Sequence, residues 1–201
     1  MRFFDFLFPP RVDEAALRDF SDEKFFALLQ PRLVPETRPG TVALLPFSDP
    51  DIRAAIHEAK YHGSGRAFTL LGAALADYLR DCDDIGKKAR IIPVPLGTKR
   101  EKERGFNQVR EVARRASKET GIEIEDSLLT RTRETPSQVS LHRDKREENM
   151  RGAFVAAHPA DPTYTYIVVD DVITTGATLQ AAIDALKAAG ATHVIPIALA
   201  H

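Results

Sequence analysis

The sequence predicts an α/β fold, with a central and mainly parallel sheet flanked by helices and a small helical appendage at the N-terminus. The first observation is a strand–helix–strand pattern over residues 166–198, in which two apolar runs enclose a helical segment. Such a unit implies two parallel strands joined by a right-handed crossover. The second observation is a short apolar run over residues 90–95 that ends in Pro-Val-Pro, as expected of a buried parallel strand that leads into a loop.

The composition is that of a globular protein with a substantial core. The chain has 201 residues, of which 43% are hydrophobic and 28% charged, which is ordinary for such proteins. With a formal net charge of −1, the protein as a whole has no net positive charge that would favour binding to nucleic acid. The single cysteine, Cys82, excludes an intramolecular disulfide and a Cys-rich zinc site. No apolar run approaches the roughly 18 residues needed to cross a bilayer, so a cytoplasmic location without membrane contact is expected.

Residues 1–40 are interpreted as the appendage and residues 41–201 as the main domain. The first ten residues are apolar but short, and we expect them to pack as an arm on the body rather than act as a signal peptide. Residues 11–30 have helical spacing of apolar side chains, which prolines and Gly40 interrupt. Residues 41–47 then predict a short buried strand.

Two helices and a long loop are expected in the middle of the chain. Asp49 can cap a helix that begins at Pro50, and after a turn at 62–65 a second amphipathic helix directs Leu70 to Leu79 inward. A further helix is predicted over residues 107–120. Residues 131–151 are charged and without apolar periodicity, which predicts a long loop, and loops of this length are usually functional or disordered. The final helix, 178–189, ends at Gly190 and leads to a last strand at 193–198.

The stretch from Tyr166 to Leu179 carries the clearest functional signal. A buried strand leads to two carboxylates, Asp170 and Asp171, and a loop with three threonines and Gly176 then opens a helix. Ligands of open α/β sheets bind beyond the carboxyl ends of strands, and a helix N-terminus with its unpaired amides suits a phosphate. Gly176 is expected to let the backbone approach that anion, and the threonine hydroxyls can donate to it.

Asp170 and Asp171 would repel a phosphate, but as hydrogen-bond acceptors they suit a diol such as the 2′ and 3′ hydroxyls of ribose. Adjacent side chains of a strand point to opposite faces, so both can face one ligand only if the strand has ended at Asp170. An anion site beside a diol site predicts a ribose 5-phosphate. The alternative of a purely structural acidic turn is disfavoured because all these features occur together. A Walker-type loop lacks its glycine pattern and its Lys-Ser/Thr pair.

At these residues the sequence resembles the type I phosphoribosyltransferases, whose signature is an apolar run, two acidic residues and Thr-Thr-Gly-x-Thr. The segment VVDDVITTGAT matches this signature in full. Further segments resemble the ComF (competence protein F) branch of the family, and the resemblance covers residues 42–201. Those segments are Ile92–Pro95, Glu103–Gln108, Thr135–Gln138, then Arg143, Arg146 and Asn149, and Gly152–Phe154. The zinc-binding cysteines of that branch are absent, since Val12 stands where a cysteine is expected, and the helical region 11–30 is expected in their place.

The resemblance implies a type I phosphoribosyltransferase fold that binds 5-phosphoribosyl-1-pyrophosphate (PRPP). It implies that Asp170 and Asp171 hold the ribose hydroxyls and contact Mg²⁺ indirectly, through those hydroxyls or water. It also implies that the loop after Pro95 lies at the pyrophosphate and that residues 133–151 close over it. The implied PRPP-binding residues are Leu96, Gly97, Thr98, Lys99, Arg100, Asp170, Asp171, Val172, Ile173, Thr174, Thr175, Gly176, Ala177 and Thr178. The residues expected to act in catalysis are Asp170, Asp171, Arg104, Lys99 and Arg143, with Arg146 and Gln138 as weaker candidates.

Three functions remain open from the sequence. The first is Mg²⁺-dependent transfer of phosphoribosyl to an unidentified nitrogen acceptor, in which the cationic side chains neutralise the departing pyrophosphate. The second is a non-catalytic PRPP or nucleotide sensor. The third is a DNA-handling protein of the competence type that uses basic surfaces at 87–115 and 131–151, although Phe106 is their only aromatic residue, which disfavours base stacking. The basic residues at 99–104 alternate with glutamates and could equally be a solvated surface. A homo-oligomer is expected.

Overall fold

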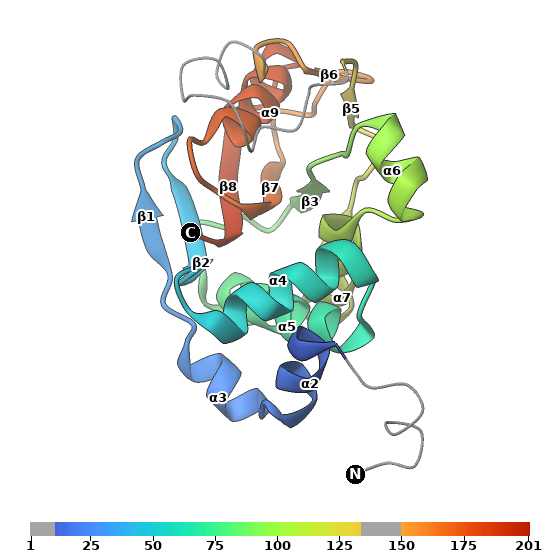
Figure 1. The fold of residues 1–201 in the computed structure, drawn as a ribbon. Helices are drawn as coiled ribbons and strands as arrows, with labels where there is room; N and C mark the ends of the chain where they lie inside the picture. Colours follow the sequence, from blue (N-terminus) through green and yellow to red (C-terminus); the bar gives the residue numbers. More distant parts are fainter. Residues whose placement is uncertain (1–10, 134–149) are drawn as a thin grey trace.

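A computed structural model describes residues 11–133 and 150–201 and confirms the predicted α/β fold (Figure 1). Its main sheet has six strands in the order β1-β2-β8-β7-β3-β4. Apart from β1, which is antiparallel to β2, all neighbouring strands are parallel. The strands are β1 (Arg32–Val34), β2 (Thr41–Leu45), β3 (Ala89–Pro93), β4 (Glu123–Ile124), β7 (Thr165–Val172) and β8 (His193–Ala200).

Helices cover both faces of the sheet (Figure 1). One face carries α4 (Pro50–His62), α5 (Gly65–Asp81) and α7 (Gln108–Thr120), and the other carries α9 (Ala177–Ala188) with a hairpin of β5 (Leu129–Arg131) and β6 (Phe154–Ala156). The side chains of β7 alternate between these two cores: Ile167 and Val169 pack with α4, α5 and α7, whereas Tyr166 and Val168 pack with α9. Burial on both faces explains why the strand is a continuous apolar run.

The appendage differs from its prediction in two ways. The helical spacing over residues 11–30 forms two short helices, α2 (Val12–Asp19) and α3 (Asp22–Ala27), because Ser21 caps the second helix by accepting a hydrogen bond from the Lys24 amide. In addition, residues 32–34, which were assigned to the appendage without a strand, form β1, the antiparallel edge of the main sheet. None of the helices in the described ranges is long and apolar enough to cross a bilayer.

The sheet is shaped so that β7 extends beyond its neighbour β3. Pairing between the two strands ends at Pro93 and Val169, and the Val94 amide donates the last hydrogen bond, 2.9 Å, to the Val169 carbonyl. On its other side β7 remains paired with β8 as far as Val172. The last three residues of β7 therefore pair with β8 on one side, and on the other side they border the space beyond the end of β3.

Candidate functional site

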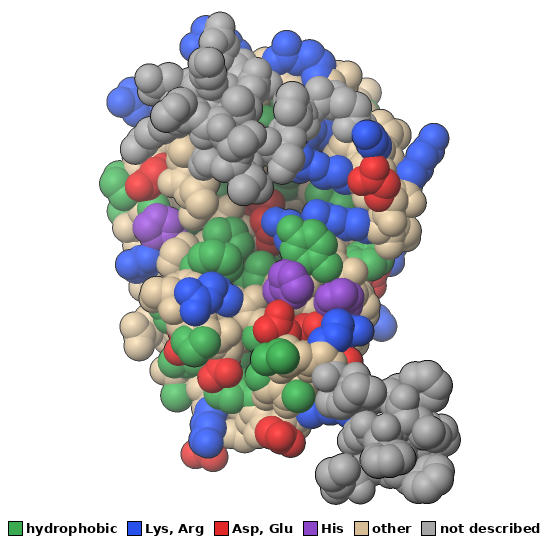
Figure 2. Space-filling model, viewed as in Figure 1, with side chains coloured by type: hydrophobic (Ala, Val, Ile, Leu, Met, Phe, Trp, Pro, Cys, Tyr) green, Lys and Arg blue, Asp and Glu red, His purple; other side chains and the backbone are tan. Residues whose placement is uncertain are grey.

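A cavity of about 630 Å³ lies beyond the carboxyl ends of β3 and β7. In the space-filling view, acidic and basic side chains meet in the recess at the middle of this face (Figure 2). Six elements or their connections contribute to its wall: the end of α4, the segment after β3, α6 (Thr98–Arg104), the start of α7, β5 and the β7–α9 junction. The cavity thus lies where ligands bind in open α/β sheets.

The lining residues are Lys60, Tyr61, Val94, Pro95, Leu96, Arg100, Glu103, Arg104, Gln108, Arg131, Asp170, Asp171, Val172, Ile173, Thr174, Thr175, Gly176, Ala177, Thr178 and Leu179.

The two adjacent carboxylates reach one cavity in a way that the sequence argument did not foresee. We expected the strand to end at Asp170, but β7 continues to Val172. Asp171 contacts residues of α4 and α7, on one face of the sheet, whereas Asp170 lies on the other face, within electrostatic range of Arg131. Both line the cavity because β3 has already ended, so that the cavity extends along the open edge of β7 and meets both faces.

Asp171 is held in place by three donors. Its Oδ2 accepts a hydrogen bond of 2.8 Å from Nε2 of Gln108 and lies 3.2 Å from Nζ of Lys60, and its Oδ1 accepts a bond of 2.7 Å from the Val172 amide. The residue is only 9% exposed. A buried carboxylate is stable when it is paired and hydrogen-bonded, and these donors fix its orientation.

Asp170 has a different electrostatic environment. Its Oδ1 accepts a hydrogen bond of 2.9 Å from the Asp171 amide. Burial, and then the neighbouring charge of Asp171, raise the pKa of Asp170 to about 7, against the opposing effects of that hydrogen bond and of the Lys60 and Arg131 cations. A pKa in this range makes the charge of Asp170 sensitive to pH near neutrality.

The segment after the acidic pair forms the expected loop and helix start. Every residue from Val172 to Thr178 lines the cavity, and α9 begins at Ala177, whose amide donates to the hydroxyl of Thr175. The first amides of a helix have no partner within it and favour an anion. The arrangement of hydroxyls and a helix N-terminus around one end of the cavity can hold a phosphate group.

Gly176 is required here for a reason that the sequence did not reveal. Its φ is +74°, in the left-handed region, and a Cβ at this position would lie 2.8 Å from the carbonyl oxygen of Glu36. The turn that follows β1 thus packs directly behind the loop. Any side chain at Gly176 would be strained by its backbone angle and would also collide with this turn.

The basic segment after Pro95 is helical, which corrects the expectation of a loop at 96–100. Only Leu96 and Gly97 precede α6, and Gly105 ends it with φ +79°. Because a helix presents one face to the cavity, α6 contributes Arg100, Glu103 and Arg104 to the lining, whereas Gly97, Thr98 and Lys99 are not lining residues. Arg104 is oriented by a hydrogen bond of 3.0 Å from its Nη1 to Oε1 of Gln108, and its guanidinium lies 5.2 Å from the centre of the Tyr61 ring.

Eight lining residues were not predicted as site residues: Lys60, Tyr61, Val94, Pro95, Glu103, Gln108, Arg131 and Leu179. For Lys60 a signal was present. The apolar face of α4 runs through Ile52 and Ile56, and Lys60 is the next position at the same spacing, so a charge occurs where an inward-facing apolar residue is expected. Gln108 had two signals, its place at a helix start and its place in the Glu103–Gln108 segment that resembles the ComF branch. The predictions for Arg143, Arg146 and Gln138, and for closure by the 133–151 segment, concern residues that lie largely outside the described ranges.

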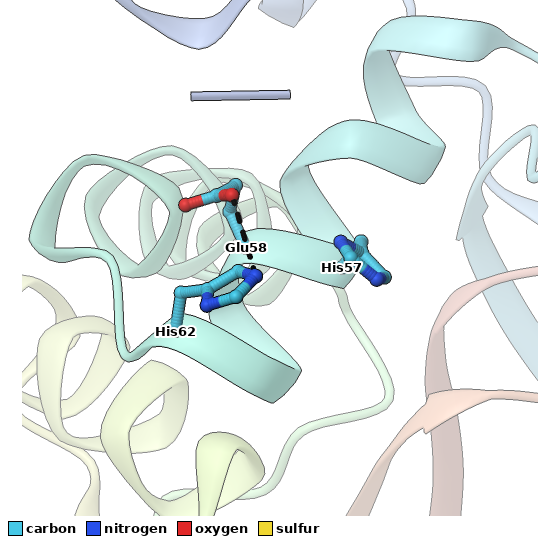
Figure 3. A group of neighbouring side chains, drawn as sticks. All are labelled: His57, Glu58 and His62. Carbon is cyan, nitrogen blue, oxygen red and sulfur yellow. Dashed lines mark ion pairs between the residues drawn. The ribbon is translucent and has the colours of Figure 1, made fainter. Parts of the chain in front are cut away.

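A second polar group lies on α4, away from the cavity lining. His57, Glu58 and His62 place their potential ligand atoms within 4.8 Å of one another (Figure 3). However, the buried Glu58 accepts two hydrogen bonds from Arg11, of 3.0 and 2.7 Å, and His57 Nδ1 lies 2.9 Å from the Asp13 carboxylate. The guanidinium therefore competes with a metal for this carboxylate and already neutralises its charge. We therefore interpret the group as an ion-pair cluster that fastens the appendage to α4.

Comparison with known proteins adds family information to this geometry. Residues 85–201 match the family model described as "Phosphoribosyl transferase domain". The chain is 30% identical over 148 residues to DNA utilization protein YhgH of Shigella flexneri, in an alignment that covers 72% of this chain and 65% of that protein. It is 33% identical over 106 residues to Competence protein F of Haemophilus influenzae, covering 52% of this chain and 46% of that one. The chain thus spans less than two thirds of these relatives.

Among solved structures, the glutamine phosphoribosylpyrophosphate amidotransferase of B. subtilis, complexed with ADP and GMP, is similar to this chain with a TM-score of 0.43 and 22% sequence identity. The match covers 71% of this chain and 30% of that one.

Proposed function

Because this chain belongs to the phosphoribosyl transferase domain family, as a ComF-like type I member, we propose that its cavity binds PRPP. We further propose that the protein transfers the phosphoribosyl group to a nitrogen acceptor with release of pyrophosphate. One observation carries the proposal: the two carboxyl groups of β7 and the amide-rich start of α9 line the same cavity. The acceptors for a diol and the donors for a phosphate are separated by only a few residues of the chain. A ribose 5-phosphate requires both kinds of group at such a short separation.

Four basic side chains of the cavity lining support the pyrophosphate part of the proposal. Lys60, Arg100, Arg104 and Arg131 all line the cavity. In the proposed reaction the bond between C1 and the pyrophosphate oxygen breaks, its electron pair leaves with the pyrophosphate, and the acceptor nitrogen forms the new bond to C1 and loses a proton. The negative charge that develops on the leaving group is what preorganised cations stabilise, and the ribose contacts keep C1 in place for attack.

Magnesium is part of the proposal because the chemistry of the donor set suits it. Carboxylate and hydroxyl oxygens are the ligands this ion prefers, and it commonly keeps several waters. Asp170 and Asp171 would hold it indirectly, through ribose hydroxyls or water, since Asp171 is already engaged by Gln108 and Lys60. When bound, the ion would supply positive charge to the departing pyrophosphate.

The main alternatives are a PRPP or nucleotide sensor and a DNA-handling protein. The names of the relatives favour the latter, but the arginines of α7 are engaged with acidic partners. Arg110 lies 3.1 Å from Glu101 and 3.2 Å from Asp126, and Arg114 lies 2.6 Å from Glu111. Cations that are paired within the protein have less charge to offer to DNA phosphates, so the sugar-phosphate proposal is preferred.

Two measurements test the proposal. Titration calorimetry with PRPP and Mg²⁺ should show binding that the double variant Asp170→Asn, Asp171→Asn loses while its circular dichroism stays unchanged. A screen of purines, pyrimidines and amines for PRPP-dependent pyrophosphate release should then identify an acceptor. Turnover selects the transferase and binding without turnover selects the sensor. No PRPP binding, together with salt-sensitive binding to a DNA duplex, would select the DNA-handling role.

A further inference from the structure

Gln108 joins two charged side chains of opposite sign inside the cavity wall. It is the first residue of α7, is 4% exposed, and follows Asn107, whose side chain caps that helix. Its Nε2 donates to Asp171 Oδ2 at 2.8 Å, and its Oε1 accepts from Arg104 Nη1 at 3.0 Å. The contacts form one continuous chain, from the guanidinium through the carboxamide to the carboxylate.

The two charges determine which way the carboxamide points. The reversed amide would place its oxygen against the Asp171 carboxylate and its NH₂ group against the Arg104 guanidinium, so both contacts would become repulsive. A buried side chain with both ends bonded to ions has little freedom to move. The position of one ion is therefore tied to the position of the other through the two hydrogen bonds of the same amide.

We propose that Gln108 is a positioning residue that couples the two halves of the cavity. This inference rests on the proposed function, in which Asp171 contacts the ribose and Arg104 contacts the pyrophosphate. An anion that holds Arg104 also fixes the carboxamide, and the carboxamide then presents Asp171 to the ribose hydroxyls. Ribose 5-phosphate and pyrophosphate should consequently each favour the binding of the other, because a coupling free energy acts equally in both directions.

Substitutions at Gln108 separate the two contacts. Gln108→Glu has nearly the same shape and keeps an acceptor for Arg104, but it turns a second carboxylate toward Asp171. Gln108→Leu removes both contacts and keeps an apolar side chain at a buried site. Thr192→Val is the matched control, because it removes a side-chain hydrogen bond of 2.7 Å to the Pro162 carbonyl at the opposite end of the sheet.

The experiment measures the affinity of ribose 5-phosphate by calorimetry in Mg²⁺, without and with saturating inorganic pyrophosphate. In the unchanged protein and in Thr192→Val, pyrophosphate should tighten ribose 5-phosphate binding. In Gln108→Leu this enhancement should fall by about fivefold or more. The affinity for ribose 5-phosphate alone and the affinity for pyrophosphate alone should each fall about tenfold. Gln108→Glu should lose ribose 5-phosphate binding while it keeps pyrophosphate binding. Thermal melting confirms that each variant is folded.

The outcomes distinguish this inference from the function on which it rests. If the unchanged protein binds neither PRPP nor ribose 5-phosphate, the proposed function is wrong and the inference with it. If it binds both, and Gln108→Leu keeps the full enhancement by pyrophosphate, only the inference is wrong. A merely structural role for Gln108 would lower both affinities together and leave the enhancement unchanged, which is also a result against coupling.

Discussion

Nζ of Lys60 lies 3.2 Å from Oδ2 of Asp171, so the last turn of α4 supplies a cation to the acidic pair at the end of β7. The same cation lowers the pKa of Asp170, against the stronger effects of burial and of Asp171. Lys60 thus stabilises negative charge on both carboxyl groups. It is also 30% exposed along its side chain and lines the cavity, which leaves it accessible to an anionic ligand.

Replacement of Lys60 by methionine should weaken PRPP binding and shift its pH dependence. Loss of a charged donor to Asp171 is expected to reduce the affinity about tenfold. The pKa of Asp170, about 7 in the unchanged protein, should rise because an opposing cation has been removed. Calorimetry from pH 6 to pH 9 would show the affinity rising with pH around a higher midpoint in the variant. An unshifted midpoint would mean that Lys60 does not act on the pair.

Asp170→Asn should abolish ribose 5-phosphate binding and yet stabilise the fold above neutral pH. The pKa of Asp170 is raised to about 7 on folding, chiefly by burial. A carboxyl with a raised folded pKa contributes stability that is present below its unfolded pKa, near 4, and that is lost as the pH rises through 7. Asparagine avoids that loss, which is about 1–2 kcal/mol once solvent screening of this partly exposed group is allowed for.

Urea unfolding at pH 4 and pH 8 measures this effect. The variant should exceed the unchanged protein in unfolding free energy at pH 8, with little difference at pH 4. An equal gain at both pH values would contradict the electrostatic explanation, since it would then arise from packing.

Gly176→Ala should destabilise the protein by about 2–3 kcal/mol, because the alanine must adopt φ +74° and its Cβ meets the Glu36 carbonyl at 2.8 Å. PRPP affinity should fall as well, since the loop has to shift. Gly65→Ala is the matched control: no atom lies within 4 Å of a Cβ there, and the residue begins α5, where alanine is favoured. Urea unfolding should show a loss for the first variant and none for the second.

Arg11→Met should lower the unfolding free energy at pH 7, because it leaves the buried Glu58 carboxylate without its main partner. The hydrogen bond from Arg11 holds the pKa of Glu58 below its ordinary value. A lowered folded pKa gives stability that is present above the unfolded pKa and lost as the pH falls through the folded value. The difference between variant and unchanged protein should therefore shrink between pH 5 and pH 3.

Arg18→Met is the control for that variant, because its bond of 2.6 Å to Glu14 is exposed and such pairs contribute under about 1 kcal/mol. Zinc and EDTA provide a further check. If the His57–Glu58–His62 group is an ion-pair cluster, neither should change the melting temperature of the unchanged protein. A zinc-dependent rise would identify a metal site instead.

The parts of the site that were predictable are those encoded within one short segment. The run from Tyr166 to Leu179 combines a strand, two carboxylates and a helix start, so local chemistry was enough to identify it. Gln108 and Asp171 are 63 positions apart in the chain, and their contact depends on how α7 packs on the sheet. No local pattern reports such packing. The same limit applies to Lys60, although its position on the apolar face of α4 was a usable signal.

The elements that were missed are short or lack apolar periodicity. Helix α6 has seven residues and buries none of them, so no hydrophobic face revealed it, and it was taken for a loop. Strand β1 has three residues with only Val34 buried, and prolines flank it. It is stabilised by pairing with β2, which single-residue preferences do not report. In both cases tertiary contacts decide the conformation.

The contact between Glu36 and Gly176 has a consequence for how this chain can be shortened. A version that starts at Thr41 would lose the edge strand β1 and also the carbonyl that backs the first turn of α9. The β7–α9 junction is therefore supported by a turn that lies about 140 positions earlier in the chain. Trimming the N-terminal region would remove a contact that supports the loop at Gly176, although none of the described residues of that region lines the cavity.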